Sequence, residues 1–483
     1  MVLADPTART AYGAVRGRTD SDGVSSFKGV PYAAPLEGPA RFQAPAPPER
    51  WDGTREADRF SADVPQVALL SGTPSAWRPG DGADCLSVNV WTPDASGGGL
   101  PVMVWVHGGA FIGGTARQPL YDGTHLARAG VVVVTLNYRV GFEGFGLLPD
   151  APDNRGLLDQ LAALRWVREN IARFGGDPDN VTFFGESAGG TSVVALTAAD
   201  AGRGLFRRTI AQSSADSYLS PRRARAVTER IAAAVGVPAT TEAFGQLPSE
   251  AIHAVQAASG QVTPFGPVLG GEVVPGLPWR RLRAEVDLIS GFNRDEWTLF
   301  ALNEDPSSQD PQAAARRAGL PPAALADYRA AHPGISDRDL YVLVQSDALF
   351  RMPSLWCAQD HPGRAWAYEL TWATPALDGA LAACHALDLP LTFGTFGDQF
   401  ASVVLGDPVP AEAETLAKEI RKAWTSFATS GDPGWPEYRA DGGAARIWDV
   451  PVSVAADLEP ASQRIWQDTP RRAGVWQGAS EES

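Results

Sequence analysis

Residues 181–190 read VTFFGESAGG, an apolar run followed by a serine between glycines. The β-branched and aromatic residues of this run are typical of a buried parallel strand, and the small residues after the serine can open a helix whose N-terminal amides face an anion. A sharp turn leaves almost no room for side chains two positions before and two after Ser187, where Gly185 and Gly189 stand. The stretch therefore predicts an α/β fold that exposes Ser187 as a nucleophile.

Strand and helix patterns alternate through the first half of the chain. Short apolar runs at 100–105 and 130–136 predict strands covered on both faces. Apolar residues at three- and four-residue steps between Gly156 and Phe174 predict an amphipathic helix, and the strand that leads to Ser187 follows directly. This βαβ succession predicts a central, mostly parallel sheet covered by helices.

Two further strands are predicted at 286–291 and 364–370. Between them, an Ala-rich segment punctuated by Pro, from about 305 to 362, predicts several short helices that form a wall or lid over a pocket. We expect one elaborated domain over residues 1–483 that contains this helical insertion.

Composition narrows the possible partners. The 483 residues carry 41 basic and 56 acidic side chains, a net charge of −15, which argues against nucleic acid or an anionic membrane surface as a partner. The chain shows neither a signal-peptide pattern nor a long apolar run, so we expect a soluble, cytoplasmic protein, either a monomer or a weak homo-oligomer. The 3 cysteines and 6 histidines lack metal-ligand spacing, so no metal or cofactor is implied.

The G-x-S-x-G pattern is short enough to occur by chance, so a base and an acid must be sought elsewhere. In sheets of this kind they follow the serine in the order acid, then histidine. Glu296 comes just after the strand at 286–291, where loops face the ligand crevice, but the neighbouring Asp295 and other acids compete with it. Among the few histidines, His385 lies in a loop after the next strand and is the strongest candidate for the base.

An oxyanion hole needs preorganised backbone N–H groups. The loop HGGAF at 107–111 directly follows the strand that ends near Val106, and its glycines allow the amides of Gly109 and Ala110 to point inward, with the Ala188 amide as a third donor. The alternative is that this glycine-rich loop is an ordinary turn with no role in an oxyanion hole.

Several blocks of sequence together resemble the type-B carboxylesterase family, which includes bacterial para-nitrobenzyl esterases and the cholinesterases. In the order of that family they are FKGVPYA at 27–33, PARF at 39–42, DCLSVNVW at 84–91, NYRVG at 137–141, NIARFGGDP at 170–178 and FFGESAGG at 183–190. The resemblance runs from about Ala11 to about Tyr438 and implies an α/β-hydrolase fold.

The resemblance also implies roles for individual residues. Ser187 would be the nucleophile, Glu296 the acid and His385 the base, with Gly109, Ala110 and Ala188 as oxyanion donors, Ser213 and Asp388 around the Glu–His pair, and Glu186 in the substrate pocket. Phe111 is placed in the pocket separately, as one of the aromatic side chains that would suit an aryl or apolar substrate. Glu186 would favour cationic groups near the site, or serve as a structural hydrogen-bonding group.

Two departures from the family bear on the structure. Val64 stands where many members have the first cysteine of a disulfide, which leaves Cys85 unpaired and agrees with a reducing cytoplasm. Ala83 replaces the acid that usually pairs with the arginine matching Arg41, so this ion pair must be rebuilt with another group, with Asp84 as a candidate, or be absent.

Together these features predict a serine carboxylesterase that hydrolyses small to medium acyl or aryl esters through an acyl-enzyme. The alternatives are a carbamate or aryl-amide hydrolase or an acyltransferase with the same triad, and, from another class, a non-catalytic binding protein. Because His385 must be neutral to act as a base, we expect activity to fall below roughly pH 6 to 6.5.

Overall fold

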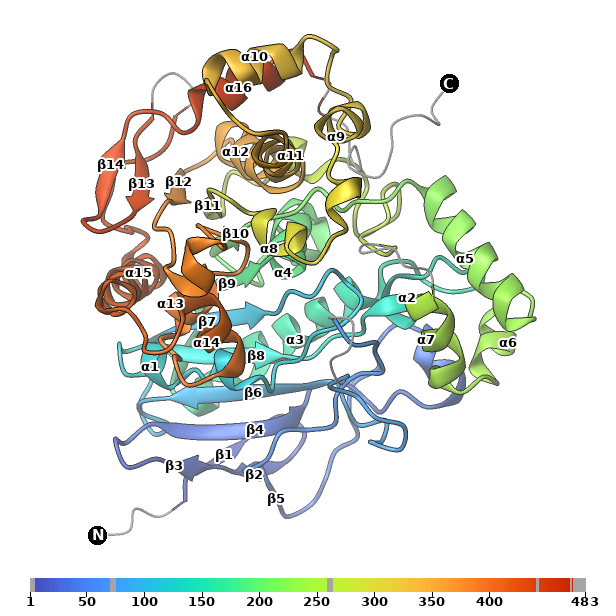
Figure 1. The fold of residues 1–483 in the computed structure, drawn as a ribbon. Helices are drawn as coiled ribbons and strands as arrows, with labels where there is room; N and C mark the ends of the chain where they lie inside the picture. The colour runs from blue at the N-terminus through green and yellow to red at the C-terminus, as the bar shows by residue number, and fades with distance from the viewer. Residues whose placement is uncertain (1–4, 70–74, 259–263, 440–442, 470, 472–483) are drawn as a thin grey trace.

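The computed structural model describes residues 5–69, 75–258, 264–439, 443–469 and 471. Within them an 11-stranded sheet has the order β14-β13-β12-β11-β10-β9-β7-β8-β6-β4-β3 (Figure 1). Its strands are β3 (Arg18–Thr19), β4 (Ser25–Pro31), β6 (Ser87–Thr92), β7 (Leu100–Val106), β8 (Val132–Leu136), β9 (Gly176–Glu186), β10 (Arg208–Gln212), β11 (Asp287–Asn293), β12 (Ala365–Leu370), β13 (Ala445–Trp448) and β14 (Ser453–Ala455). A 3-stranded sheet joins β1 (Thr7–Arg9), β2 (Ala14–Arg16) and β5 (Thr54–Glu56).

The centre of the sheet is parallel and its edges are antiparallel. Strands β8, β7, β9, β10, β11, β12 and β13 run parallel to one another, whereas β6, β4 and β3 at one edge and β14 at the other are antiparallel to their neighbours. The predicted parallel sheet is therefore confirmed, as is each strand predicted from an apolar run. The antiparallel edges carry no such continuous signal and were not predicted.

Helices cover both faces of the sheet. They are α1 (Thr124–Ala127), α2 (Gly141–Phe145), α3 (Arg155–Asn170), α4 (Ala188–Ala198), α5 (Pro221–Val235), α6 (Thr241–Gly245), α7 (Ser249–Ala258), α8 (Thr298–Ala301), α9 (Pro311–Arg317), α10 (Ala324–Ala331), α11 (Asp337–Ser346), α12 (Met352–Gln359), α13 (Asp388–Phe393), α14 (Gln399–Leu405), α15 (Ala411–Ser430) and α16 (Pro460–Trp466). In β7, Val102 and Val104 join the apolar cluster under α3 and α4, and Met103 and Trp105 join the cluster under α13 and α15. Alternate side chains of one strand thus fill two cores, which explains its continuous apolar run.

The segment expected to hold several short helices contains α9, α10, α11 and α12 (Figure 1). A π-helical turn, Asp347–Arg351, joins the last two of these helices. Such turns are rare and are often found at functional sites.

Two other features are the state of the cysteines and the length and polarity of the helices. Cys85, Cys357 and Cys384 are all free and buried. Among the described residues, no helix combines the length and the apolar character needed to cross a bilayer.

Arg41 has a different partner from the one suggested by sequence. Its guanidinium lies 2.6 Å from Glu143 Oε1 on α2, and it also donates to the Ser249 hydroxyl at 2.8 Å. The suggestion of Asp84 was wrong, because the replacement acid comes from a helix about a hundred residues further along the chain.

A second buried arginine ties the loop after β8 to α3. Arg139 donates through Nη2 to Asp159 Oδ1 at 2.6 Å and through Nε to Asp159 Oδ2 at 2.8 Å, and neither side chain is exposed. A bidentate pair of this kind is worth little compared with a well-packed apolar pair, but removal of one partner leaves a buried charge without compensation.

We therefore expect Asp159→Ala to lower the free energy of unfolding by about 3–5 kcal/mol, measured by chemical denaturation. The matched control is Asp179→Ala, which breaks the exposed pair of Asp179 with Arg168 and should leave the unfolding curve unchanged. Equal effects of the two substitutions would contradict this account.

Candidate active site

Ser187 occupies the turn between β9 and α4 with φ 56° and ψ −122°, a conformation that L-residues rarely adopt. A Cβ on Gly189 would lie 2.1 Å from the Val106 carbonyl oxygen, and one on Gly185 would lie 2.7 Å from the Gly189 carbonyl carbon. The Ser187 amide donates to the Gln212 carbonyl on β10 at 3.0 Å. The two glycines are thus required by the close approach of neighbouring backbone, as the sequence indicated.

His385 and Glu296 form a buried pair. The imidazole Nδ1 lies 2.6 Å from Glu296 Oε2, and the other carboxylate oxygen, Oε1, accepts the backbone N–H of Asn293 at 2.8 Å. Asp295, the competing acid, instead lies 3.5 Å from Arg294 and is partly exposed. The geometry therefore selects Glu296 as the carboxylate that orients His385.

A second carboxylate faces the other imidazole nitrogen. Glu186 Oε1 lies 3.0 Å from His385 Nε2, an ion-pair distance without hydrogen-bond geometry. Ser187 follows Glu186 directly in the chain, yet among the described contacts its hydroxyl makes no hydrogen bond to His385. Catalytic hydrogen bonds are often long before substrate binds, so this geometry is compatible with a Ser–His relay.

These two carboxylates decide the proton affinity of the histidine. Burial by itself lowers the pKa of His385, but Glu186 and Glu296 outweigh it and raise the pKa to about 9. Burial raises the pKa of Glu186, and the nearby His385 opposes this shift. The imidazole therefore holds its proton to a higher pH than a free histidine does.

Aromatic rings hold the imidazole from the side. The Phe350 ring, from the π-helical turn, lies 4.4 Å from His385 between centroids, and the Phe300 ring lies at 5.3 Å. Phe350 is almost fully buried. These rings restrict the rotation of the histidine.

Polar side chains at strand ends connect the pair to its surroundings. Asn293 donates through Nδ2 to the Cys384 carbonyl at 2.8 Å and to Asp388 Oδ1 at 3.4 Å, and Gln212 donates to Asp388 Oδ2 at 2.6 Å. Burial raises the pKa of Asp388 to about 6. Gln212 and Asn293 were missed from sequence, although each is a polar residue at the carboxyl end of an apolar parallel strand, where such sheets bind ligands.

Ser213 and Phe111 stay predictions. Ser213 follows β10 with φ 47°, but its buried hydroxyl makes no hydrogen bond to any described residue. The Phe111 ring has no exposed surface and packs edge-on against Phe145 at 4.7 Å, inside the core rather than in an open pocket.

The loop after β7 lies against the serine. A Cβ on Gly108 would come within 3.1 Å of Ser187 Cβ. The next three residues have left-handed backbone, with φ 116° at Gly109, 51° at Ala110 and 59° at Phe111. The N–H groups of Gly109 and Ala110 donate to no described residue, so both are available to an oxyanion.

His107 supports this loop through its ring and its backbone carbonyl. Its ring stacks on Tyr138 at 4.5 Å, and the Tyr138 hydroxyl donates to the His107 carbonyl at 2.9 Å. Burial lowers the pKa of His107 to about 4, so the ring is neutral at physiological pH.

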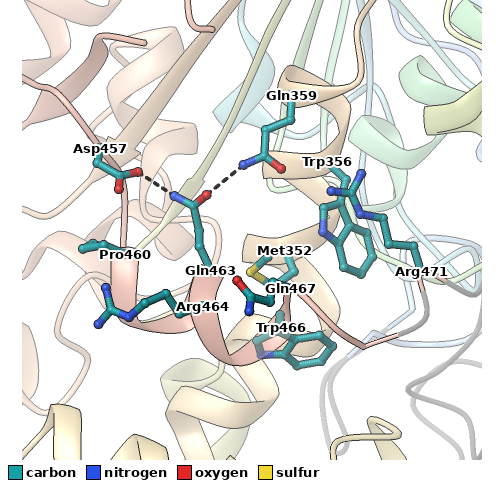
Figure 2. A pocket seen from close by; sticks show the side chains of 10 residues that line it. All are labelled: Met352, Trp356, Gln359, Asp457, Pro460, Gln463, Arg464, Trp466, Gln467 and Arg471. Carbon is teal, nitrogen blue, oxygen red and sulfur yellow. Dashed lines mark hydrogen bonds between the residues drawn. The ribbon is translucent and has the colours of Figure 1, made fainter. Parts of the chain in front are cut away.

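A pocket of about 340 Å³ lies elsewhere, between α12 and α16 (Figure 2). Its lining includes Trp356, Gln463 and Trp466, and none of the candidate catalytic residues. Within the described part of the chain, no group of three or more His, Cys, Asp or Glu side chains could hold a metal ion.

The parallel sheet with a serine on a strained strand-to-helix turn, and a Glu–His pair beside it, defines an α/β-hydrolase. A model of the carboxylesterase family matches residues 4–450, and the chain belongs to this family.

Individual relatives agree with this membership. The chain is 36% identical to the para-nitrobenzyl esterase of Bacillus subtilis (strain 168), over 93% of this chain and 96% of that protein. It is 32% identical to the liver carboxylesterase of Sus scrofa, over 96% of this chain and 93% of that protein. The crystal structure of a carboxylesterase of Geobacillus stearothermophilus at pH 6.2 superposes with a TM-score of 0.86 at 35% identity, covering 95% of this chain and 100% of that one. The protein is a carboxylic ester hydrolase, and the comparisons do not favour the alternatives.

The charge around His385 corrects the expected pH dependence. Because the pKa of His385 is raised, its neutral form is lost at a higher pH than an ordinary histidine, and the acid limb of kcat/KM should lie above pH 6.5. Glu186→Gln removes one carboxylate that raises this pKa, so the limb should move to lower pH when p-nitrophenyl acetate is the substrate.

The control is Glu369→Gln. Burial raises the pKa of this carboxyl to about 8, as it raises that of Glu186, but Glu369 is not among the groups that shift the pKa of His385. This variant should keep the wild-type limb. A limb that stays in place or rises in Glu186→Gln would contradict the assignment.

Proposed function

We propose that Ser187, His385 and Glu296 carry out ester hydrolysis in two acyl-transfer steps. The observation that carries the proposal is the 2.6 Å contact between His385 Nδ1 and Glu296 Oε2, buried beside the strained serine turn. This contact fixes Nδ1 as the protonated nitrogen of the neutral ring and leaves Nε2 as the base.

In the first step, His385 Nε2 takes the hydroxyl proton as Ser187 Oγ attacks the ester carbonyl carbon. The negative charge on the carbonyl oxygen is met by the N–H groups of Gly109, Ala110 and Ala188, the last at the N-terminus of α4. The protonated His385 gives its proton to the leaving alcohol, and an acyl-enzyme on Ser187 remains. Water, deprotonated by the same histidine, then releases the acid and restores the serine.

For the imidazolium to form, nearby negative charge must be available. Glu296 supplies it at Nδ1, 2.6 Å away, and the carboxyl of Glu186 lies 3.0 Å from Nε2. We propose acyl or aryl esters of small to medium size as substrates. Their chain-length preference is measurable with a series of p-nitrophenyl esters.

We further propose a cytoplasmic location and a monomer or weak homo-oligomer. Support for the reducing compartment comes from the three cysteines, which are all free and buried.

Ser187→Ala tests the mechanism. The variant should lose nearly all turnover of p-nitrophenyl acetate and retain at most a ~10³-fold enhancement over water, from the oxyanion donors and binding alone. It should also fail to react with a fluorophosphonate probe, because no nucleophile is left.

Ser462→Ala is the matched control, since Ser462 is fully buried in α16 and is outside the proposed machinery. It should keep both activity and labelling. Normal activity in the Ser187→Ala protein would disprove the proposed nucleophile.

A further inference from the structure

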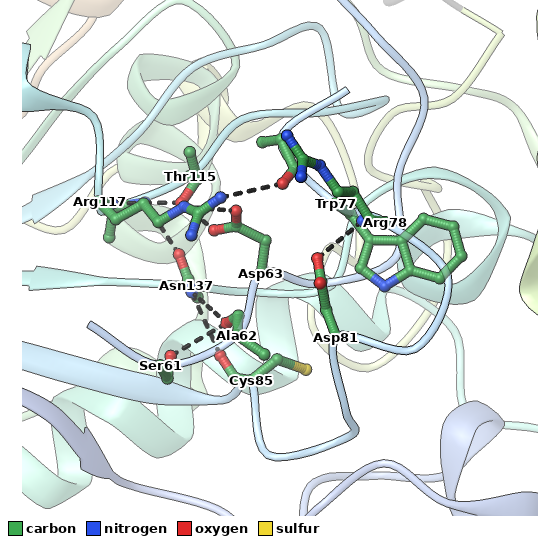
Figure 3. A network of polar contacts seen from close by, with 12 residues as sticks. Ser61, Ala62, Asp63, Trp77, Arg78, Asp81, Cys85, Thr115, Arg117 and Asn137 are labelled. Atoms are coloured by element: carbon green, nitrogen blue, oxygen red, sulfur yellow. Dashed lines mark hydrogen bonds and ion pairs between the residues drawn. The ribbon is translucent and has the colours of Figure 1, made fainter. Parts of the chain in front are cut away.

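The segment Ser61–Val67, named the strap here, lies against the loop that follows β7. Figure 3 shows the contacts: Asp63 accepts the Thr115 hydroxyl and lies 2.7 Å from Arg117 Nε. Asn137, directly after β8, links the two segments, because its Nδ2 donates to the Ala62 carbonyl at 3.3 Å and its Oδ1 accepts the Ala116 N–H at 2.8 Å. Asp63 is buried. No disulfide ties the described part of this region, because position 64 is a valine and Cys85 is free. Polar contacts therefore attach the strap to the loop.

Gln66 makes the most complete of these contacts. Its Oε1 accepts the Gly114 amide at 2.7 Å, and its Nε2 donates to the Gly114 carbonyl at 2.9 Å and to the Val64 carbonyl at 3.1 Å. The side chain is buried, so water does not compete for these bonds. One side-chain amide thus holds both polar groups of a residue at the end of the oxyanion loop.

The strap also packs directly onto the loop backbone. A Cβ on Gly113 would lie 3.0 Å from Gln66 Oε1 and 3.1 Å from the Val67 carbonyl oxygen. Gly114 has φ 120°, which only glycine adopts readily. The loop therefore has no space to shift towards the strap while Gln66 stays in place.

The conformation that is held in this way is strained. Ala110 and Phe111, with φ 51° and 59°, occupy a region that is unfavourable for non-glycine residues and that persists only under constraint from the surroundings. The loop closes on itself through Gly113 N–H to the Gly109 carbonyl at 3.2 Å, and Gly141 N–H holds the Phe111 carbonyl at 2.6 Å. Gln66 supplies the constraint at the remaining end, at Gly114.

We propose that Gln66 is a positioning residue for the oxyanion hole, which holds the Gly109 and Ala110 amides towards the reacting carbonyl. This inference rests on the proposed role of those amides. Loss of the Gln66 contacts would let the strained residues relax and turn the N–H groups away. Because misplacement weakens transition-state stabilisation more than substrate binding, kcat should fall and KM should change little.

The test compares Gln66→Glu with Asn154→Asp. Asn154 makes the same paired contact elsewhere: it accepts the Val268 amide at 2.7 Å and donates to the Val268 carbonyl at 2.9 Å. Each substitution keeps the acceptor oxygen and removes the N–H donor, so both variants lose a comparable buried contact. Gln66→Met serves as a second variant that introduces no buried charge. Rates are normalised to the number of sites that a fluorophosphonate labels at completion, so that unfolded protein is not counted.

Both Gln66 variants should lower kcat for p-nitrophenyl acetate by about 10- to 100-fold, a part of the loss expected when one oxyanion donor is removed. They should weaken inhibition by a trifluoromethyl ketone, whose adduct with Ser187 carries an oxyanion, by a similar factor, whereas Asn154→Asp should leave kcat and inhibition unchanged. Equal kcat in all variants, or an unchanged ketone affinity in both Gln66 variants, would overturn the inference.

The role of Gln66 and the proposed catalytic mechanism can fail independently of each other. If the wild-type activity survives Ser187→Ala, the proposed mechanism fails whatever the Gln66 variants do. If Ser187→Ala is inactive and both Gln66 variants are normal, only the positioning role of Gln66 fails.

Discussion

The left-handed backbone of Ser187 is the constraint on which the rest of the site depends. It costs free energy locally, and it is held because α4 packs on β9 and β10 and because the Ser187 amide is bonded to the neighbouring strand. No larger residue fits at Gly185 or Gly189, since a Cβ at either position would overlap with backbone atoms. The turn therefore sets where the hydroxyl, the start of α4 and the loop after β7 meet.

Around this turn the protein concentrates buried negative charge. Glu186, Glu296 and Asp388 all lie in the interior near His385, and burial raises the pKa of Glu186 and Asp388. Such charges would oppose folding if they were isolated, and the protonated form of His385, whose pKa is raised by the neighbouring carboxylates, compensates them.

The two halves of the site are held by different means. The Glu–His pair is fixed from inside the sheet, by the Asn293 backbone N–H on Glu296 and by the Phe350 ring beside His385, and Gln212 holds the nearby Asp388. The loop after β7 is fixed from outside, by the strap and its Gln66 amide. Sequence predicted the strands and the loop well, because apolar runs and glycines act locally. It missed Gln66, Gln212 and Asn293, because a single polar residue shows no sign of its partner.

By itself, the sequence determined the parallel sheet, the serine turn with its required glycines, and the family to which the chain belongs, since these depend on local sterics and on continuous motifs. Only the tertiary structure decided how the carboxylates lie around His385. It placed Glu296, the acid that the family resemblance had already indicated, at Nδ1, brought Glu186 to Nε2, and gave Arg41 the partner Glu143 in place of Asp84. These choices join residues far apart in the chain, and the sheet's register and the packing of its loops set their distances.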